Sequence, residues 1–247
     1  MPKKPTSNDK KTPSKRSNSS KPIVLVICAI LISIIFVGFF FYGFPASNLG
    51  SQSSSSDQSL KTASDIPLAD AKIKGNSNAL VTFVDFSDFG CPFCQRYATT
   101  TLPQLMKDYV DTNKIRYAFM QFPLDEHPNA KSAAMASECA NDQGKFWQYH
   151  NTLFSAQSQW KSLSANDAST DFKKYAIDLG LNPSKFDSCL DSKKYENKIN
   201  HDIQIGSTYV TGTPTFYIGN NKNGYTEIDG SQPPSTFQQT IDHLLKS

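Results

Sequence analysis

Residues 79–94 read ALVTFVDFSDFGCPFC, and the class of fold follows from this stretch. Its first part, Ala79–Ser87, is rich in β-branched and aromatic residues and predicts a strand. The apolar character is nearly continuous, as in a central strand covered on both faces. Cys91 and Cys94 follow, and apolar positions then recur at helical spacing as far as about Tyr109. We therefore expect a strand followed by a helix that begins at a C-x-x-C motif.

The elements after this stretch complete an α/β pattern. Ile115–Phe122 predicts a second strand, and a strand–helix–strand unit makes the two strands parallel. Residues 129–206 show helical periodicity and no convincing strand. Two short strands, Thr215–Ile218 and Thr226–Asp229, precede an amphipathic helix at Ser235–Leu245. Within the helical block we expect five helices: Ala130–Asp142, Lys145–Phe154, Asp167–Leu179, Pro183–Leu190 and Lys193–Ile205.

The charge of the chain is unevenly distributed. The sequence has 25 Lys+Arg and 22 Asp+Glu, for a net charge of +3. Seven basic residues and one acidic residue precede position 22, so the remainder carries 18 basic and 21 acidic residues, net −3. A nucleic-acid-binding domain needs clustered positive charge on its folded surface. The composition therefore argues against a nucleic-acid partner.

A long apolar run lies near the N-terminus. Ile23–Tyr42 contains twenty residues, nearly all apolar, and twenty helical residues span about 30 Å, the thickness of a bilayer core. We therefore expect residues 22–44 to form a retained transmembrane anchor. The alternative is a cleaved signal peptide, whose apolar region is usually about 7–15 residues long. Cys28 does not indicate a lipoprotein signal, because bulky Ile27 precedes it.

The flanking segments predict the orientation of this anchor. Residues 1–21 are basic and polar, so we expect a disordered tail that the positive-inside rule places in the cytoplasm. Residues 45–65 are rich in serine and predict a flexible linker. The domain at 66–247 would then lie outside the cytoplasm, held at a bacterial cell membrane by a single span.

Four of the five cysteines follow the predicted anchor. A single C-x-x-C beside a βαβ unit is typical of a thioredoxin-like redox motif. Pro92 suits the first helical turn, and the positive end of the helix favours a Cys91 thiolate, the attacking species in disulfide exchange. The alternatives are an inert disulfide or a zinc site. Zinc would need four ligands, Cys91 and Cys94 with Cys139 and Cys189, and the second pair has no C-x-x-C of its own.

The histidines show no metal-ligand spacing, and we expect each to be a cap or a surface residue. They are His127, His150, His201 and His243. The sequence accordingly predicts no metal and no cofactor.

Several separate motifs resemble the DsbA-like thiol–disulfide oxidoreductases. Val84–Cys94 (VDFSDFGCPFC) resembles their active-site strand and helix, and Gly212–Phe216 (GTPTF) resembles their cis-proline loop. Parts of the helical block resemble their inserted helical domain: Pro123–Ala130, Glu138–Ala140 and Gln143–Trp147. The resemblance covers the chain from about residue 66 to its end. It implies a thioredoxin-like α/β fold (βαβ … ββα) with an all-helical insertion at about 128–206.

The resemblance also implies residue roles. Cys91 would be the nucleophile and Cys94 the more buried resolving thiol. Asp85 stands at the family's buried acidic position, where it would exchange a proton with Cys94; an acid exposed at the strand end is the alternative. Pro214 would be cis and face Cys91, with the Thr213 backbone open to substrate; an ordinary trans-proline is the alternative. Residues expected to bind or support substrate are Pro92, Phe93, Thr213 and Pro214.

Asp88 and Phe93 are two further residues of the active-site stretch for which the sequence suggests a role. Asp88 is the better candidate for an exposed acid or a helix cap. Phe93 departs from the best-known oxidants of the family, which have histidine between the cysteines. Phenylalanine offers the thiolate neither a hydrogen bond nor positive charge. We therefore expect a depressed Cys91 pKa, but less depressed than in the histidine-bearing members.

Cys139 and Cys189 both fall in the predicted helical insertion. An oxidising compartment favours their pairing. The bond would close a loop of about fifty residues, which is worth roughly 4 kcal/mol in the entropic model. Two buried free thiols are the alternative. We expect a structural disulfide rather than a second redox pair.

The sequence thus leads to a membrane-anchored thiol–disulfide oxidoreductase that introduces disulfides into exported, cysteine-containing proteins. Its recycling would need a membrane redox partner of the quinone-linked DsbB or VKOR type, which is inferred from the resemblance. A reductase or isomerase using the same pair is one alternative. A non-catalytic binding module or chaperone on the same scaffold is another, although intact Cys91, Cys94 and Pro214 argue against it.

Overall fold

The computed structural model describes residues 62–63, 65–68 and 70–247. The predicted tail at 1–21, the anchor at 22–44 and the linker up to residue 61 lie outside the described residues. None of the helices in the described part has the length and apolar character that crossing a bilayer requires.

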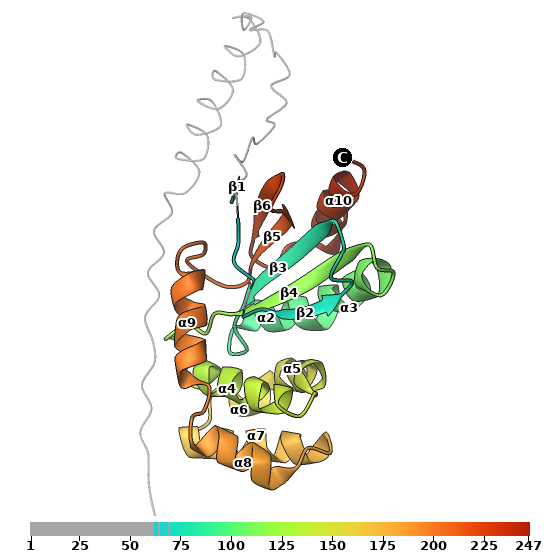
Figure 1. Ribbon diagram of the computed structural model, residues 1–247. Coiled ribbons are helices and arrows are strands. Elements are labelled where there is room, and N and C mark those ends of the chain that lie inside the picture. Colours follow the sequence, from blue (N-terminus) through green and yellow to red (C-terminus); the bar gives the residue numbers. More distant parts are fainter. Residues whose placement is uncertain (1–61, 64, 69) are drawn as a thin grey trace, which may run out of the picture. The chain divides into compact units, whose positions relative to one another are not determined.

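A mixed six-stranded sheet is the centre of the fold (Figure 1). Its strand order is β1-β6-β5-β3-β4-β2. Strands β3 and β4 are parallel, as predicted, and the other neighbouring pairs are antiparallel. The strands are β1 (Thr62–Ala63), β2 (Lys72–Gly75), β3 (Val81–Ser87), β4 (Ile115–Gln121), β5 (Thr215–Asn220) and β6 (Gly224–Asp229).

Strand β3 is covered on both faces. All seven of its residues are buried. Phe83 belongs to the larger apolar core, which continues into the helical insertion, whereas Val84 and Phe86 belong to a second core on the other face. Because side chains alternate along a strand, Asp85 faces the same side as Phe83. The central strand therefore carries a carboxyl group into the larger core.

The sequence patterns do not predict two of the strands. Strand β2 is only four residues long and alternates between half-buried and exposed positions. Strand β1 lies within the predicted linker at 45–65 and pairs with Tyr225 and Thr226 of β6. The linker prediction is therefore wrong at its C-terminal end. Segments this short show little periodicity, so the sequence gives no sign of them. They become strands because they form hydrogen bonds with a neighbouring strand at the edge of the sheet.

The helix that begins at the C-x-x-C motif is interrupted by π-helical turns. It consists of α2 (Pro92–Arg96), η1 (Tyr97–Thr101), α3 (Leu102–Leu105) and η2 (Met106–Val110), where η marks a π-helical turn. Pro103 lies in its middle, and a proline in a helix interior removes one backbone hydrogen bond. The hydrogen-bond ladder changes pitch on both sides of this proline.

The helical insertion predicted at about 128–206 corresponds to six helices. Figure 1 shows α7 and α8 farther from the sheet than α4, α5 and α6, while α9 runs back beside the sheet. The helices are α4 (Ala130–Asn141), α5 (Phe146–Ser155), α6 (Gln157–Trp160), α7 (Ala165–Asp178), α8 (Pro183–Asp191) and α9 (Glu196–Gly206). The sequence predicts five of these helices but not α6, since four residues show no helical period. The last helix, α10 (Pro234–Leu244), packs Phe237 and Ile241 into the larger core.

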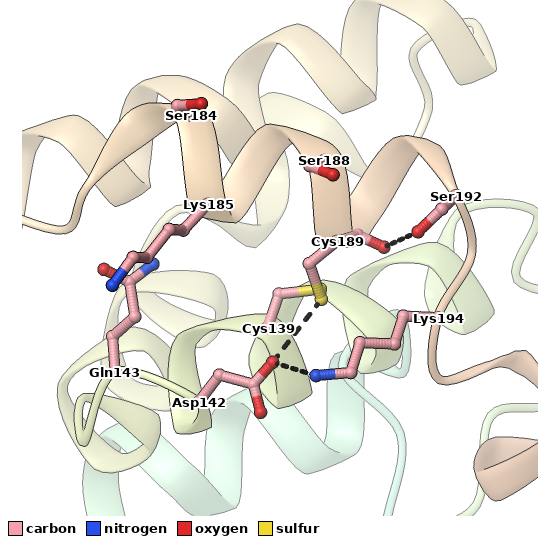
Figure 2. A pocket seen from close by; sticks show the side chains of 9 residues that line it. All are labelled: Cys139, Asp142, Gln143, Ser184, Lys185, Ser188, Cys189, Ser192 and Lys194. Carbon is pink, nitrogen blue, oxygen red and sulfur yellow. Dashed lines mark hydrogen bonds and ion pairs between the residues drawn. A yellow bond between two sulfur atoms is a disulfide. The ribbon is translucent and has the colours of Figure 1, made fainter.

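Cys139 of α4 and Cys189 of α8 form a disulfide (Figure 2). The bond joins an inner helix of the insertion to an outer one, across 50 residues of sequence. A hollow of about 790 Å³ lies beside it, where Lys194 Nζ is 2.7 Å from Asp142 Oδ2. Because both cysteines are already bonded to each other, the alternative zinc site built on four cysteines is wrong.

Replacing both Cys139 and Cys189 by serine is expected to lower the free energy of unfolding by about 4 kcal/mol, because the unfolded chain regains the freedom of a long loop. Denaturant unfolding of the variant and the parent measures this difference. Ser188→Ala is the matched control, since Ser188 is exposed beside the same hollow and should change stability by less than about 0.5 kcal/mol. A loss below about 1 kcal/mol in the double variant would contradict the expectation.

Candidate active site

The C-x-x-C motif lies at the N-terminus of α2. Cys91 is the N-cap residue and Pro92 occupies the first helical position. Cys94 lies one turn further inside. Both thiols are free, so the structure shows the reduced form. Cys91 is 3% exposed and Cys94 0%, which makes Cys91 the sulfur that another molecule reaches first.

The two thiols differ in acidity. Hydrogen bonds from the Cys94 thiol and from the backbone N–H groups of Cys94 and Phe93 lower the pKa of Cys91 to about 6, although burial acts in the opposite direction. Burial raises the pKa of Cys94 well above its usual value, and the Cys91 sulfur adds to this effect. At neutral pH, Cys91 is therefore the thiolate and Cys94 the thiol that donates to it.

The loop before β5 lies against Cys91. The Thr213–Pro214 peptide bond is cis. The Sγ of Cys91 is 3.3 Å from the Thr213 carbonyl oxygen, although 122 residues separate them in sequence. The backbone N–H of Gly230 donates to the Pro214 carbonyl at 2.9 Å and holds the loop from behind. Folding thus brings the C-x-x-C motif and the Gly-Thr-Pro motif together.

Asp85 is a buried acid. It is 1% exposed, and the Tyr117 hydroxyl donates to its Oδ2 at 2.5 Å. Burial raises the pKa of Asp85 to about 7, while the hydrogen bond from Tyr117 acts in the opposite direction. The negative charge of Asp85 also raises the pKa of Cys94. The alternative of an acid exposed at the strand end is therefore wrong.

Asp88 is also buried, so the expectation of an exposed acid is wrong, and Cys91 is the N-cap of α2, so the expectation of a helix cap is wrong as well. Its Oδ1 accepts from the Gly90 N–H at 2.6 Å, and its Oδ2 accepts from the Leu124 N–H at 3.0 Å. His127 Nδ1 lies 2.6 Å from the same Oδ2. A Cβ atom at Gly90 would stand 2.6 Å from His127 Cβ, so this turn requires glycine. Burial raises the Asp88 pKa.

Phe93 and Arg96 form an exposed surface next to Cys91. Phe93 is 54% exposed, and the Arg96 guanidinium carbon lies 5.3 Å from the centre of its ring. Arg96 Nε also donates to Ser231 Oγ at 3.3 Å. The surface therefore combines an apolar ring with a cation, in a position to contact a polypeptide that approaches the nucleophile.

Two residues that touch the site gave no signal in the sequence. Tyr117 belongs to β4 and meets Asp85 only through the sheet register. Gln157 belongs to α6, and its side-chain amide donates to the backbone carbonyls of Phe89 and Cys91. Neither residue lies near a motif, so only the tertiary fold identifies them.

His150 is not a cap or a surface residue. It is buried, and burial lowers its pKa to about 4. Five aromatic rings surround it: Phe89, Phe119, Phe146, Trp147 and Phe154. The position of His150 on the apolar face of α5, with Phe146 and Leu153, is the sequence signal that indicates this burial.

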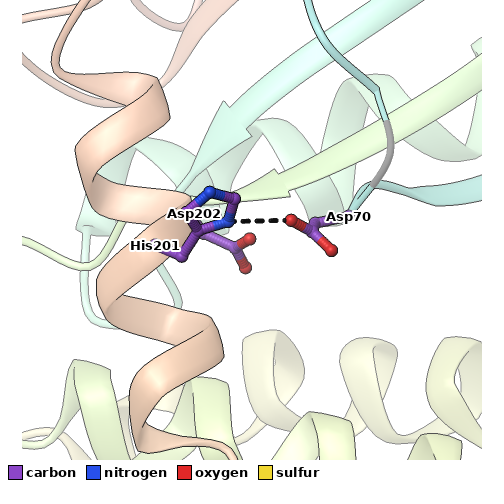
Figure 3. Close-up of side chains that lie close together, drawn as sticks. All are labelled: Asp70, His201 and Asp202. Atoms are coloured by element: carbon purple, nitrogen blue, oxygen red, sulfur yellow. Dashed lines mark hydrogen bonds and ion pairs between the residues drawn. The ribbon is translucent and has the colours of Figure 1, made fainter.

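Asp70, His201 and Asp202 each place one potential metal-ligand atom within 4.8 Å of the others (Figure 3). The sequence spacing does not reveal this group. His201 Nδ1 lies 3.0 Å from Asp70 Oδ2. The Lys198 ammonium is 2.7 Å from Asp202 Oδ2 and 3.2 Å from Glu138. A side-chain cation thus already neutralises the buried carboxylate, and we assign no metal role to this group.

Comparison with known proteins identifies the class. The sequence pattern of the family described as Thioredoxin matches residues 70–243. The crystal structure of α-DsbA1 from Wolbachia pipientis is similar, with a TM-score of 0.64, 25% identity, and coverage of 73% of this chain and 94% of that one. Oxidised BdbD from Bacillus subtilis has a TM-score of 0.67 at 22% identity, over 76% and 99% of the two chains. The chain belongs to the thioredoxin family and is DsbA-like.

Relatives among the curated proteins are longer than the matched region. A Rickettsia felis protein, provisionally named protein-disulfide oxidoreductase, is 29% identical over 64% of this chain and 56% of its own length. The Na⁺/H⁺ antiporter NhaA 3 of Salinispora tropica is 32% identical over 61% of this chain. The matched region makes up 22% of the antiporter, so the similarity concerns one part of that protein.

The position between the cysteines should control the acidity of Cys91. We expect ultraviolet titration of the reduced chain to give a Cys91 pKa of about 6. Phe93→His adds a donor and positive charge, and should lower this pKa further, by about one unit. Phe93→Leu, which keeps the position apolar, should leave it unchanged. A parent pKa at or above about 8.5, the value of a free cysteine, would contradict the assignment.

Asp85 should make stability depend on pH. Its carboxyl has a pKa of about 7 when folded, against a usual value of 3.8. The contribution of Asp85 to the free energy of unfolding is therefore fully present below about pH 4 and is lost as the pH rises through 7. The loss is on the order of 4 kcal/mol. Denaturant unfolding of reduced protein should show Asp85→Asn gaining stability over the parent across this window. Asp125→Asn, at an exposed position, should follow the parent at each pH; parallel curves for D85N and the parent would refute the expectation.

Proposed function

We propose that the protein is a membrane-anchored disulfide oxidase that acts outside the cytoplasm on exported proteins. The observation that carries this proposal is the Cys91 sulfur, with its pKa lowered to about 6, lying 3.3 Å from the cis-proline loop. A thiol of low pKa is a good leaving group, and stabilising the reduced form makes the pair more oxidising. The lowered pKa of Cys91 thus supports disulfide donation as the direction of the reaction.

In the first step, a substrate thiolate attacks Cys91 Sγ of the oxidised pair. The Cys91–Cys94 bond breaks, a mixed disulfide forms at Cys91, and Cys94 leaves with the electron pair. The leaving sulfur needs a proton, since burial strongly favours its neutral form. Asp85 supplies it, because a carboxyl group with a pKa of about 7 is half protonated at neutral pH.

In the second step, another thiolate of the substrate attacks the substrate sulfur of the mixed disulfide. The new disulfide forms within the substrate, and Cys91 leaves as a thiolate held by the helix N-terminus. Thr213 and Pro214 position the substrate chain beside Cys91, while Pro92 begins the helix that stabilises the thiolate. Exposed Phe93 provides an apolar contact.

The cycle closes when the reduced pair passes two electrons to a membrane redox partner. We place a quinone-linked oxidase of the DsbB or VKOR type in this role, with single-pass anchoring by residues 22–44. The apolar run Ile23–Tyr42 and the basic residues before it support this arrangement. The cytoplasmic side then holds the N-terminus, and the redox domain faces the compartment in which exported proteins fold.

The reduction potential of Cys91–Cys94 tests the direction of the reaction. Equilibration of the full chain with glutathione should give a value nearer to about −120 mV, typical of a strong oxidant, than to about −270 mV, typical of thioredoxin. A value near −270 mV would refute the oxidase and favour a reductase that draws on a membrane electron donor.

The variant with both active-site cysteines replaced by serine is the control for catalysis. It should lose disulfide formation in a reduced, unfolded substrate protein completely. If the variant loses disulfide formation but still keeps the substrate protein from aggregating as well as the parent does, a binding module or chaperone on the same scaffold would be favoured instead. The C139S/C189S variant keeps Cys91 and Cys94. It should therefore form disulfides in the substrate as the parent does, under conditions in which the variant is folded.

A further inference from the structure

Gln157 connects the helical insertion to the active-site turn. It is the first residue of α6, and its side chain lies in the interior, 2% exposed. Its Nε2 donates to the carbonyl oxygen of Phe89 at 2.7 Å and to that of Cys91 at 2.8 Å. A side-chain amide has only two N–H donors. Both are therefore used on the short turn that carries the nucleophile.

The same turn is held from a second direction. Asp88 accepts from the Gly90 N–H at 2.6 Å, and the Cys91 carbonyl also accepts from the Gln95 N–H at 3.0 Å in the first turn of α2. The Cys91 carbonyl thus accepts two hydrogen bonds, one from the first turn of α2 and one from the helical insertion. The Gln157 amide therefore contacts the backbone at the point where helix α2 begins.

We propose that Gln157 is a positioning residue through which the helical insertion sets how oxidising the Cys91–Cys94 pair is. This inference deepens the proposed function and rests on the redox role of the pair. The backbone N–H groups of Phe93 and Cys94 stabilise the Cys91 thiolate, and hydrogen bonds weaken steeply as their angle departs from linearity. Holding the turn in one orientation keeps these N–H groups aimed at the sulfur.

Loss of the amide has a defined consequence. Two buried carbonyl groups lose a donor, which is costly in the protein interior. The turn then reorients to find other partners, and the N–H groups no longer align with Cys91 Sγ. The thiolate form of the reduced protein is destabilised, whereas the disulfide form, which carries no charge, is not. The pair becomes less oxidising.

The test compares Gln157→Leu and Gln157→Glu with the parent, as full-length chains, by equilibration with glutathione and by titration of Cys91. Q157L removes both donors, and should shift the equilibrium constant about tenfold toward the disulfide form, or about 30 mV for this two-electron couple, with a raised Cys91 pKa. Q157E keeps the shape but has no donor when ionised. Where this carboxyl is ionised and Cys91 is a thiolate, the shift of Q157E should be at least as large as that of Q157L.

Gln148→Leu is the matched control, because Gln148 is an exposed glutamine of the same insertion. It should stay within twofold of the parent. Thermal unfolding of both redox forms separates positioning from a purely structural role: positioning lowers the stability of the reduced form more than that of the oxidised form. Equal losses, equilibrium constants within twofold of the parent, or failure of both Gln157 variants to fold would each overturn the inference.

The outcomes for the two proposals are distinguishable. A parent chain whose Cys91–Cys94 pair does not exchange with glutathione would remove the proposed function and this inference with it. A parent potential near the reducing end would refute only the oxidase, and the shift between Q157L and the parent would still measure the contribution of Gln157. A parent that is oxidising with an unshifted Q157L refutes this inference alone.

Discussion

The hydrogen bonds at the N-terminus of α2 are the interaction on which the site depends. The Cys91 sulfur receives the N–H groups that the first helical turn leaves without partners. These N–H groups point at the sulfur only while the turn before the helix keeps its conformation. Buried side chains around the turn hold it in place through hydrogen bonds. Asp88 holds the amide side of the turn, and Gln157 holds its carbonyl side.

Burial gives neighbouring groups opposite acid–base properties. Cys91 and Cys94 belong to one helical turn, but only Cys91 receives the helix donors, and Cys94 lies in the core beside a buried carboxyl group. The same burial raises the pKa of Asp85 to about 7. The low pKa of Cys91 thus comes from the donors of the helix N-terminus, which outweigh its burial, whereas the raised pKa values of Cys94 and Asp85 come from burial without such donors for Cys94 and with only partial compensation by Tyr117 for Asp85.

Long segments with a clear period are the ones whose secondary structure the sequence predicts correctly. Strand β3 and the helices α4, α5, α7, α8 and α9 are long enough to show a clear pattern, and all were predicted. The edge strands β1 and β2 and the short helix α6 were missed, because their conformation comes from neighbouring elements. The burial of Asp88 is decided by a segment farther along the sequence, whereas His150 shares the apolar face of its own helix, a pattern that the prediction of a surface residue does not take into account.

The amino-acid sequence alone is enough to predict the order of the elements, the motif at the helix start and the proline loop that resembles a known family. These are local properties, which depend on residue type and spacing within a few turns or strands. Three contacts of the site exist only in the folded chain. Thr213 contacts Cys91, Tyr117 contacts Asp85, and Gln157 joins the insertion to the turn that carries the nucleophile. The partners in these contacts are 122, 32 and 66 residues apart, and contacts over such separations form only when sheet register and helix packing bring the groups together.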